Sequence, residues 1–156
     1  ERVSHLRERL EAWAEKQGHR PRLLVGKPGL DGHSNGAEMI AVAARHVGFD
    51  VIYAGIRMTC AEIAASAVEE NVDLIGLSIL SGSHMALAKE LMDSLQTQGA
   101  AQDIPVILGG ILPKQDFEAL QALGIRRLFT PSDDDLADIL DSLVDVLDEA
   151  DAEAWY

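Results

Sequence analysis

The pattern of apolar and polar residues alternates along the chain between two kinds, one that predicts strands and one that predicts helices. Short runs that are apolar almost throughout predict strands buried on both faces, whereas apolar residues three or four positions apart predict helices. The predicted strands are 22–26, 51–54, 74–78, 105–108 and 127–129. One helix is predicted near 36–47, and another is predicted to begin after Thr59, because Glu62 has the spacing of a capping box.

Five strand–helix units of this length predict an α/β fold with a parallel sheet and helices on both faces. We expect the flavodoxin-like strand order 2-1-3-4-5. An extra helix is predicted at 2–17, and its narrow apolar stripe covers either the domain's own surface or a partner. The expected organisation is an N-terminal helical extension at 1–20, one domain at 21–150 and a loose C-terminus at 151–156.

Composition narrows the classes of function. The chain has 156 residues, enough for one domain, and a single cysteine, Cys60, which excludes an internal disulfide and favours the cytoplasm. It has no apolar run long enough to span a membrane, and its formal net charge of -13 argues against nucleic acid as a partner. After Arg127 there are ten acidic residues and no Lys or Arg. We favour a solvated helix face for them over a docking surface for a basic partner.

The unusual loops of the chain all follow predicted strands. The longest is 26–36, with four glycines and a proline, and the others are 78–83, 109–112 and 130–131. In the expected topology these loops share the carboxyl edge of the sheet, where ligands bind beside strand 1. This convergence predicts a ligand site at that edge.

Several common sites do not fit these loops. Gly26-Lys27 is followed by Pro28, so the phosphate loop of nucleotidases is absent, and the glycine spacing does not match the dinucleotide fingerprint. A receiver domain needs an aspartate where Ser78 ends the third strand. No serine lies on a Gly-x-Ser-x-Gly turn, which argues against a serine hydrolase. The histidines at positions 5, 19, 46 and 84, together with Cys60, do not have the spacing of zinc ligands. Among those histidines, we expect His84 to begin a helix rather than to contact a ligand.

Three motifs in these loops match one family. Asp31-Gly32-His33-Ser34-Asn35-Gly36 has the form Asp-x-His-x-x-Gly, Ser78-Ile79-Leu80 has the form Ser-x-Leu, and Gly109-Gly110 ends the fourth strand. In this order the set resembles the cobalamin-binding domain of coenzyme-dependent acyl-CoA mutases. The resemblance covers about residues 21–148, and the longer runs are most similar to the ethylmalonyl- and methylmalonyl-CoA mutase branch.

The resemblance implies a role for each matching residue. His33 would replace the cofactor's dimethylbenzimidazole as the lower ligand of cobalt, and Asp31 would accept the other ring N–H of that histidine and fix its tautomer. Lys27 would approach Asp31. The displaced nucleotide tail would lie between strands 1 and 3. The other residues expected to bind the cofactor are Gly32, Gly36, Ser78, Leu80, Gly109, Gly110 and, as a weaker candidate, Thr130.

The family implies a cofactor-binding subunit or domain of an adenosylcobalamin-dependent acyl-CoA mutase, an isomerase that rearranges a carbon skeleton by a radical path. Its acyl-CoA site lies in a separate (β/α)8 barrel, which does not fit in 156 residues, so this chain would hold no catalytic residue and be inactive alone. One alternative is a cobalamin carrier or sensor. Another is a flavodoxin-like domain that binds a small molecule other than a corrin.

Overall fold

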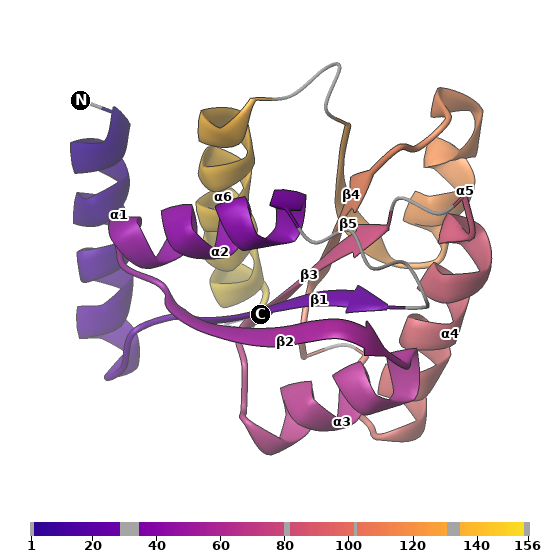
Figure 1. Ribbon diagram of the computed structural model, residues 1–156. Coiled ribbons are helices and arrows are strands. Elements are labelled where there is room, and N and C mark those ends of the chain that lie inside the picture. The colour runs from indigo at the N-terminus through magenta and orange to yellow at the C-terminus, as the bar shows by residue number, and fades with distance from the viewer. Residues whose placement is uncertain (1, 29–34, 80–81, 102, 131–134, 155–156) are drawn as a thin grey trace.

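Apolar side chains cover both faces of the central strands, and this double burial places helices on both sides of one sheet. The structure is a computed structural model, and it describes residues 2–28, 35–79, 82–101, 103–130 and 135–154. The strands are β1 (Arg22–Pro28), β2 (Asp50–Met58), β3 (Leu74–Ile79), β4 (Val106–Gly110) and β5 (Ile125–Phe129). All neighbouring strands are parallel, and their order β2-β1-β3-β4-β5 confirms the prediction from the sequence (Figure 1).

The helices form two layers, one on each face of the sheet. They are α1 (Arg2–Gln17), α2 (Asn35–Val47), α3 (Cys60–Glu69), α4 (His84–Thr97), α5 (Phe117–Ala122) and α6 (Leu136–Ala154), with a short 3₁₀ turn, η1 (Lys114–Asp116). Leu23 and Val25 of β1 pack with α1, α2 and α6, whereas Leu24 between them packs with α3 and α4. Strand alternation therefore divides the core into two clusters, one under each helical layer. Among the described residues, no helix combines the length and the apolar character needed to cross a membrane.

Strand β2 is longer than the sequence indicates. The expected strand was 51–54, but pairing with β1 continues to Met58, which lies opposite Pro28. The register between the two strands shifts after Val25 and again after Lys27. Such irregularities interrupt the simple alternation of apolar residues. The strand predicted from the sequence therefore ends before the backbone pairing does.

The predicted capping box is present at the start of α3. The Glu62 N–H donates to the Thr59 hydroxyl oxygen at 3.0 Å, and the Thr59 N–H donates to the Glu62 carboxylate at 3.0 Å. The hydrogen bond from the Thr59 N–H to the carboxylate is the main cause that lowers the pKa of Glu62. A similar reciprocal pair begins α6, where the Asp138 N–H donates to Asp135 at 2.8 Å and the Asp135 N–H donates to Asp138 at 3.3 Å.

Helix α1 covers the domain's own surface, which settles the choice left open by the sequence. Leu6, Leu10 and Trp13 are buried, with exposed fractions of 1%, 2% and 8%, in the cluster that includes α2 and α6. Val3, at the outer end of the stripe, stays 40% exposed. The helix lies alongside α6 in Figure 1.

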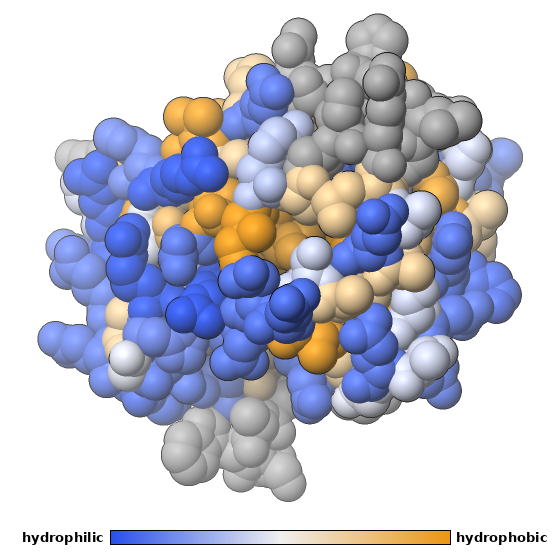
Figure 2. All heavy atoms as spheres, turned by 60° about the horizontal axis from the view of Figure 1, so that its bottom comes forward, coloured by the Kyte–Doolittle hydropathy of each residue, from blue (hydrophilic) through white to orange (hydrophobic). Residues whose placement is uncertain are grey.

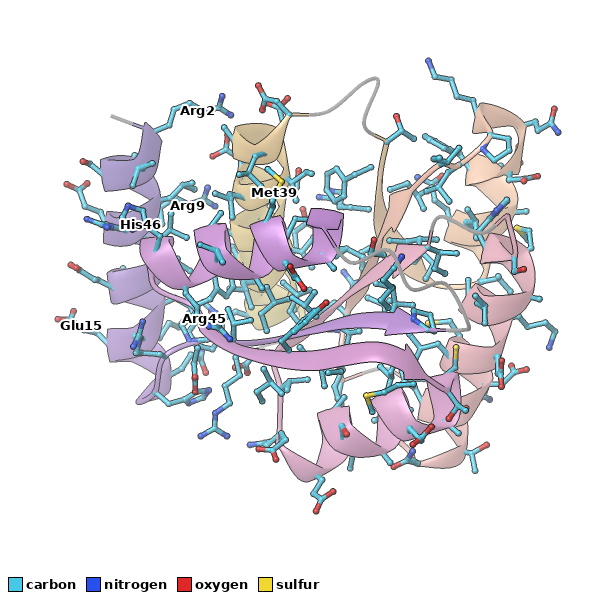
Figure 3. The ribbon with its side chains drawn as sticks, in the orientation of Figure 1. Arg2, Arg9, Glu15, Met39, Arg45 and His46 are labelled. Carbon is cyan, nitrogen blue, oxygen red and sulfur yellow. The ribbon has the colours of Figure 1, made fainter. Side chains whose placement is uncertain are left out.

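Basic side chains on α1 face the acidic side chains of α6 along the length of both helices. Arg2 pairs with Asp138 at 3.3 Å and also with Asp141, and Figure 3 shows Arg2 and Arg9 pointing from α1 toward α6. Arg9 pairs with Asp145 at 2.9 Å and Asp148 at 2.7 Å. The acidic face is therefore exposed in part, but it also has a partner within the chain. The sequence did not indicate this partner.

The last of these contacts lies at the C-terminal end of α6. Lys16 donates to Asp151 at 2.7 Å, and Gln17 also donates to this carboxylate. Residues 151–154, which the sequence analysis expected to be loose, are the last residues of α6. We relate their helical state to these two contacts, because a helix end that is held by side chains frays less.

The ion pairs between α1 and α6 predict a charge-specific effect on stability. Arg9→Glu replaces two attractive contacts with repulsion and should lower the free energy of unfolding by about 1 kcal/mol at low salt, with a smaller loss at high salt. Urea unfolding at two ionic strengths measures both effects. Glu15→Arg is the matched control, because Glu15 points away from the domain in Figure 3. Equal losses for the two variants would show that the contacts with α6 do not stabilise the fold.

Candidate functional site

A cleft opens at the carboxyl edge of the sheet, between α2 and α6. Its volume is about 230 Å³. Strands β1, β3, β4 and β5 form the floor, and the two helices form the walls. The floor residues are Leu23, Val25, Gly76, Leu77, Ser78, Ile107, Gly109, Gly110, Phe129 and Thr130, and the wall residues are Gly36, Ala37, Met39, Ile40, Leu136, Ile139 and Leu143. The cleft lies beside β1 and β3, where the strand order reverses, as expected for a ligand site in this fold.

The lining of the cleft is almost entirely apolar. Ser78 and Thr130 supply the side-chain hydroxyl groups among the described lining residues. Ser78 is half-buried and lies opposite Gly109 in the ladder between β3 and β4. Thr130 is 7% exposed and directly follows Phe129, which pairs with Gly109. A flat, mostly apolar group with one or two polar atoms suits such a cleft.

Two of the glycines predicted to bind the cofactor line the cleft, and no described atom would clash with a Cβ at either position. A Cβ added to Gly36 would meet no atom within 4 Å, and a Cβ added to Gly109 would meet atoms of Leu77 and Phe129 at ordinary contact distances of 3.9 Å. The fold would therefore accept a larger residue at each position. Packing among the described residues therefore requires glycine at neither position, since the space at Gly36 is open and Gly109 would make only ordinary contacts.

At position 110, in contrast, the backbone itself requires a glycine. Its φ is +149°, and an added Cβ would lie 1.9 Å from the carbonyl oxygen of Ile79. The backbone of β4 approaches that of β3 so closely here that only glycine fits. Gly110 lines the cleft, but the strand pairing alone is enough to require a glycine.

Lys27 is buried to an exposed fraction of 1% near the end of β1. A buried ammonium needs a partner, and Lys27 is not without one. Lysine is among the residues least often fully buried, so its position beside the predicted loop is unusual. The ammonium belongs to the same edge of the sheet as the cleft, although Lys27 does not line the cleft itself.

The remaining predicted residues, Asp31, Gly32, His33 and Leu80, lie outside the described residues. The elements that flank them are described. Strand β1 ends at Pro28, and α2, which begins at Asn35, forms one wall of the cleft. Strand β3 ends at Ile79, immediately after Ser78 of the cleft floor. The described residues that flank 29–34, and those that precede 80–81, therefore lie at the edge that contains the cleft.

Sequence reasoning identified one wall residue, Gly36, and missed the others. Met39, Ile40 and Ile139 were not among the predicted site residues. Met39 lines the cleft although its side chain is 60% exposed, so it lies at the rim, and Figure 3 shows it above α2 on the side of α6. Helical spacing identifies an apolar face, but a core face and a cleft wall have the same pattern.

A second hollow, of about 470 Å³, lies away from the cleft and is lined by Met92, Gln96, Gly99, Ala101, Ile104, Pro105, Leu123, Gly124 and Arg126. Figure 2 shows hydrophilic side chains over most of one face, with a smaller apolar area near its centre. Cys60 is buried, and its thiol donates to the Leu87 carbonyl oxygen at 3.3 Å. Burial raises the pKa of Cys60 to about 11, so the thiol stays protonated at neutral pH. Within the described ranges, no group of three or more His, Cys, Asp or Glu side chains could hold a metal ion.

The different causes at neighbouring glycines predict different costs of substitution. Gly110→Ala should lower the free energy of unfolding by about 3 kcal/mol or more, because a Cβ would overlap the Ile79 carbonyl. Gly109→Ala should change it by less than about 1 kcal/mol, because its added Cβ would make ordinary contacts. Urea unfolding of both variants measures the difference. A similar large loss for Gly109→Ala would show that this glycine, too, is required by the fold.

Comparison with known proteins identifies relatives over nearly the whole chain. A family model described as "B12 binding domain" matches residues 21–140. An ethylmalonyl-CoA mutase of Cereibacter sphaeroides is 45% identical over 148 residues, which are 95% of this chain and 22% of that protein. A methylmalonyl-CoA mutase of the same organism is 42% identical over 122 residues, 78% of this chain and 17% of that protein. The chain thus spans about a fifth of the length of these curated relatives.

Solved structures with the same architecture are more distant in sequence. A novel cobalamin-binding protein from Desulfitobacterium hafniense DCB-2 superposes with a TM-score of 0.69, covering 91% of this chain and 67% of that one. The sequence identity is 22%, so this similarity supports the fold alone.

Proposed function

The chain belongs to the B12-binding domain family, and on that premise we propose that it binds cobalamin with the nucleotide tail in the cleft between α2 and α6. Membership of the family confirms the resemblance seen in the sequence. The observation that carries the proposal for the cleft is that packing among the described residues does not require glycine at Gly36, where the space is open, or at Gly109, where an added Cβ would make ordinary contacts. The cofactor's benzimidazole is flat and mostly apolar, so it matches the apolar walls.

The polar groups of the cleft suit the same ligand. The hydroxyl of Ser78 can donate a hydrogen bond to an unprotonated ring nitrogen of the benzimidazole, which is free once it no longer coordinates cobalt. Thr130 lies on the same floor and offers a second hydroxyl near the ribose and phosphate end. Gly109 and Gly110 leave room there for the tail. The bulk of the binding free energy then comes from burial of apolar surface, with the hydroxyl groups fixing the orientation.

We propose His33 as the protein ligand of the cobalt. An unprotonated imidazole nitrogen binds such a metal well, and Asp31 two residues earlier would accept the other ring N–H. Lys27 would support Asp31 from the end of β1, and Gly32 and Leu80 would complete the contacts to the cofactor. The support for these roles is the sequence motif, together with the burial of Lys27 at the same edge.

The relatives named as mutases extend the proposal to an enzyme. We propose that the chain is the cofactor-binding part of an acyl-CoA mutase, with adenosylcobalamin as the bound form. When bound, that cofactor supplies a cobalt–carbon bond whose homolysis starts radical rearrangements. The substrate site would lie in a (β/α)8 barrel in the remaining four-fifths of such a protein, on another domain or subunit. We propose a cytoplasmic setting from the single cysteine.

Cobalt coordination can be tested by electron paramagnetic resonance of the protein reconstituted with Co(II) cobalamin. With nitrogen-15 histidine, the superhyperfine splitting of the wild type should change from a triplet to a doublet, because a protein imidazole replaces the benzimidazole. His33→Ala should lose the doublet, and His46→Ala, on the exposed face of α2, should keep it. A doublet that persists in His33→Ala would assign the ligand to another histidine. A triplet in the labelled wild type would mean that the benzimidazole stays bound to cobalt.

The proposed tail cleft predicts opposite effects of one substitution on folding and binding. Gly36→Leu should leave the free energy of unfolding unchanged or raise it by up to about 1 kcal/mol, because leucine favours the helix and the space is open. It should weaken cobalamin binding about tenfold or more and leave the binding of cobinamide, which lacks the nucleotide tail, within about threefold. Val42→Leu, at a position of the same helix that is 64% exposed and outside the cleft, is the control. Unchanged cobalamin affinity would place the tail elsewhere.

A further inference from the structure

His84 forms a buried pair with Asp116. Its ring Nε2 lies 2.7 Å from the Asp116 Oδ2, and His84 is 7% exposed. An ionised carboxylate only accepts hydrogen bonds, so the Nε2–H donates to it. The other ring nitrogen, Nδ1, is buried and has no hydrogen-bond partner among the described residues. His84 is the first residue of α4, as the sequence indicated, but its partner was not foreseen.

The pair joins two connections that leave the cleft floor. After β3, the chain reaches His84 at the start of α4, and after β4 it reaches Asp116 at the end of η1. The ladder between these strands ends where Ser78 pairs with Gly109 and Ile79 pairs with Gly110. Beyond that point, the hydrogen bond from His84 to Asp116 links the connection after β3 to the connection after β4. The cleft residues of β3 and β4 are therefore held by the last pairs of the ladder, to which they belong, and by the His84–Asp116 pair beyond it.

Neither member of the pair lines the cleft. Helix α4 lies under the opposite face of the sheet from α2 and α6. We propose that the His84–Asp116 pair is a positioning latch that fixes the ends of β3 and β4 for the nucleotide tail. This inference rests on the proposed function of the cleft. The pair acts through the backbone of Ser78, Gly109 and Gly110. The affinity for the nucleotide tail depends on the distance between these backbone segments.

The cost of burying this histidine supports a role beyond stability. A buried ring nitrogen without a hydrogen-bond partner among the described residues destabilises the fold, and an apolar side chain at the same place would avoid this cost. The carboxylate of Asp116 remains 29% exposed, so water weakens the attraction that offsets this cost. Packing alone would favour leucine or methionine at position 84. The imidazole adds a directed hydrogen bond across two connections.

The latch can be tested by binding cobalamin and cobinamide to four variants of the chain. His84→Ala and Asp116→Ala should weaken cobalamin binding about tenfold while changing cobinamide binding by less than about threefold. His84→Gln places an amide N–H near the position of Nε2 and should restore cobalamin affinity to within about threefold of the wild type. Lys89→Ala removes the exposed pair of Lys89 with Asp93 on the same helix, which spans 2.8 Å, and should change nothing.

The outcomes separate the latch from the cleft itself. If the wild type binds no cobalamin, the proposed function fails and the latch fails with it. If the wild type binds, but His84→Ala affects cobalamin and cobinamide equally, the pair only supports the fold. If His84→Ala is too unstable to measure, His84→Gln and Asp116→Ala carry the test. In that case, a cobalamin affinity of Asp116→Ala equal to that of the wild type would overturn the latch.

Discussion

The handedness of the strand connections is the constraint on which the site depends. Right-handed crossovers send the chain after β1 to one face of the sheet and the chain after β3 to the other. Because β1 and β3 are neighbours, α2 and α4 diverge from adjacent strand ends. Helix α4 therefore leaves the face of the sheet on which α2 lies, and it does not cover the carboxyl end of β3 on that face. Helix α6 returns to the face of α2 without closing on it, and the cleft follows from this topology.

One wall of the cleft depends on an element outside the matched family model. Helix α6 presents Ile139 and Leu143 to the cleft and aspartates to α1. The buried Leu6 and Leu10 fix α1 against the same cluster. The dense negative charge of α6 would repel itself if it stood alone, and the basic residues of α1 reduce that repulsion. The extra helix thus stabilises an arrangement of α6 that leaves the cleft open.

The sequence was sufficient where local pattern and topology agree. The strand order and the convergence of Ser78, Gly109 and Thr130 could be predicted, because apolar runs place strands and parallel strands share an edge. It was insufficient where contacts join distant segments. Nothing near His84 indicates Asp116, which is 32 residues away. Met39 has the spacing of a surface residue and becomes a cleft rim only when α6 is placed opposite.

Glycine shows why a motif needs structure before it has a meaning. Gly110 is required by the approach of two backbones, which any protein with this strand pairing would share. Gly109 beside it has room for a side chain, and so does Gly36 across the cleft. A fold under selection for stability alone would favour a larger residue at both positions, because a side chain reduces the conformational entropy of the unfolded chain. Packing therefore does not explain the small size of these two residues, whereas the sheet explains the small size of Gly110. The sequence pair Gly-Gly contains one residue of each kind.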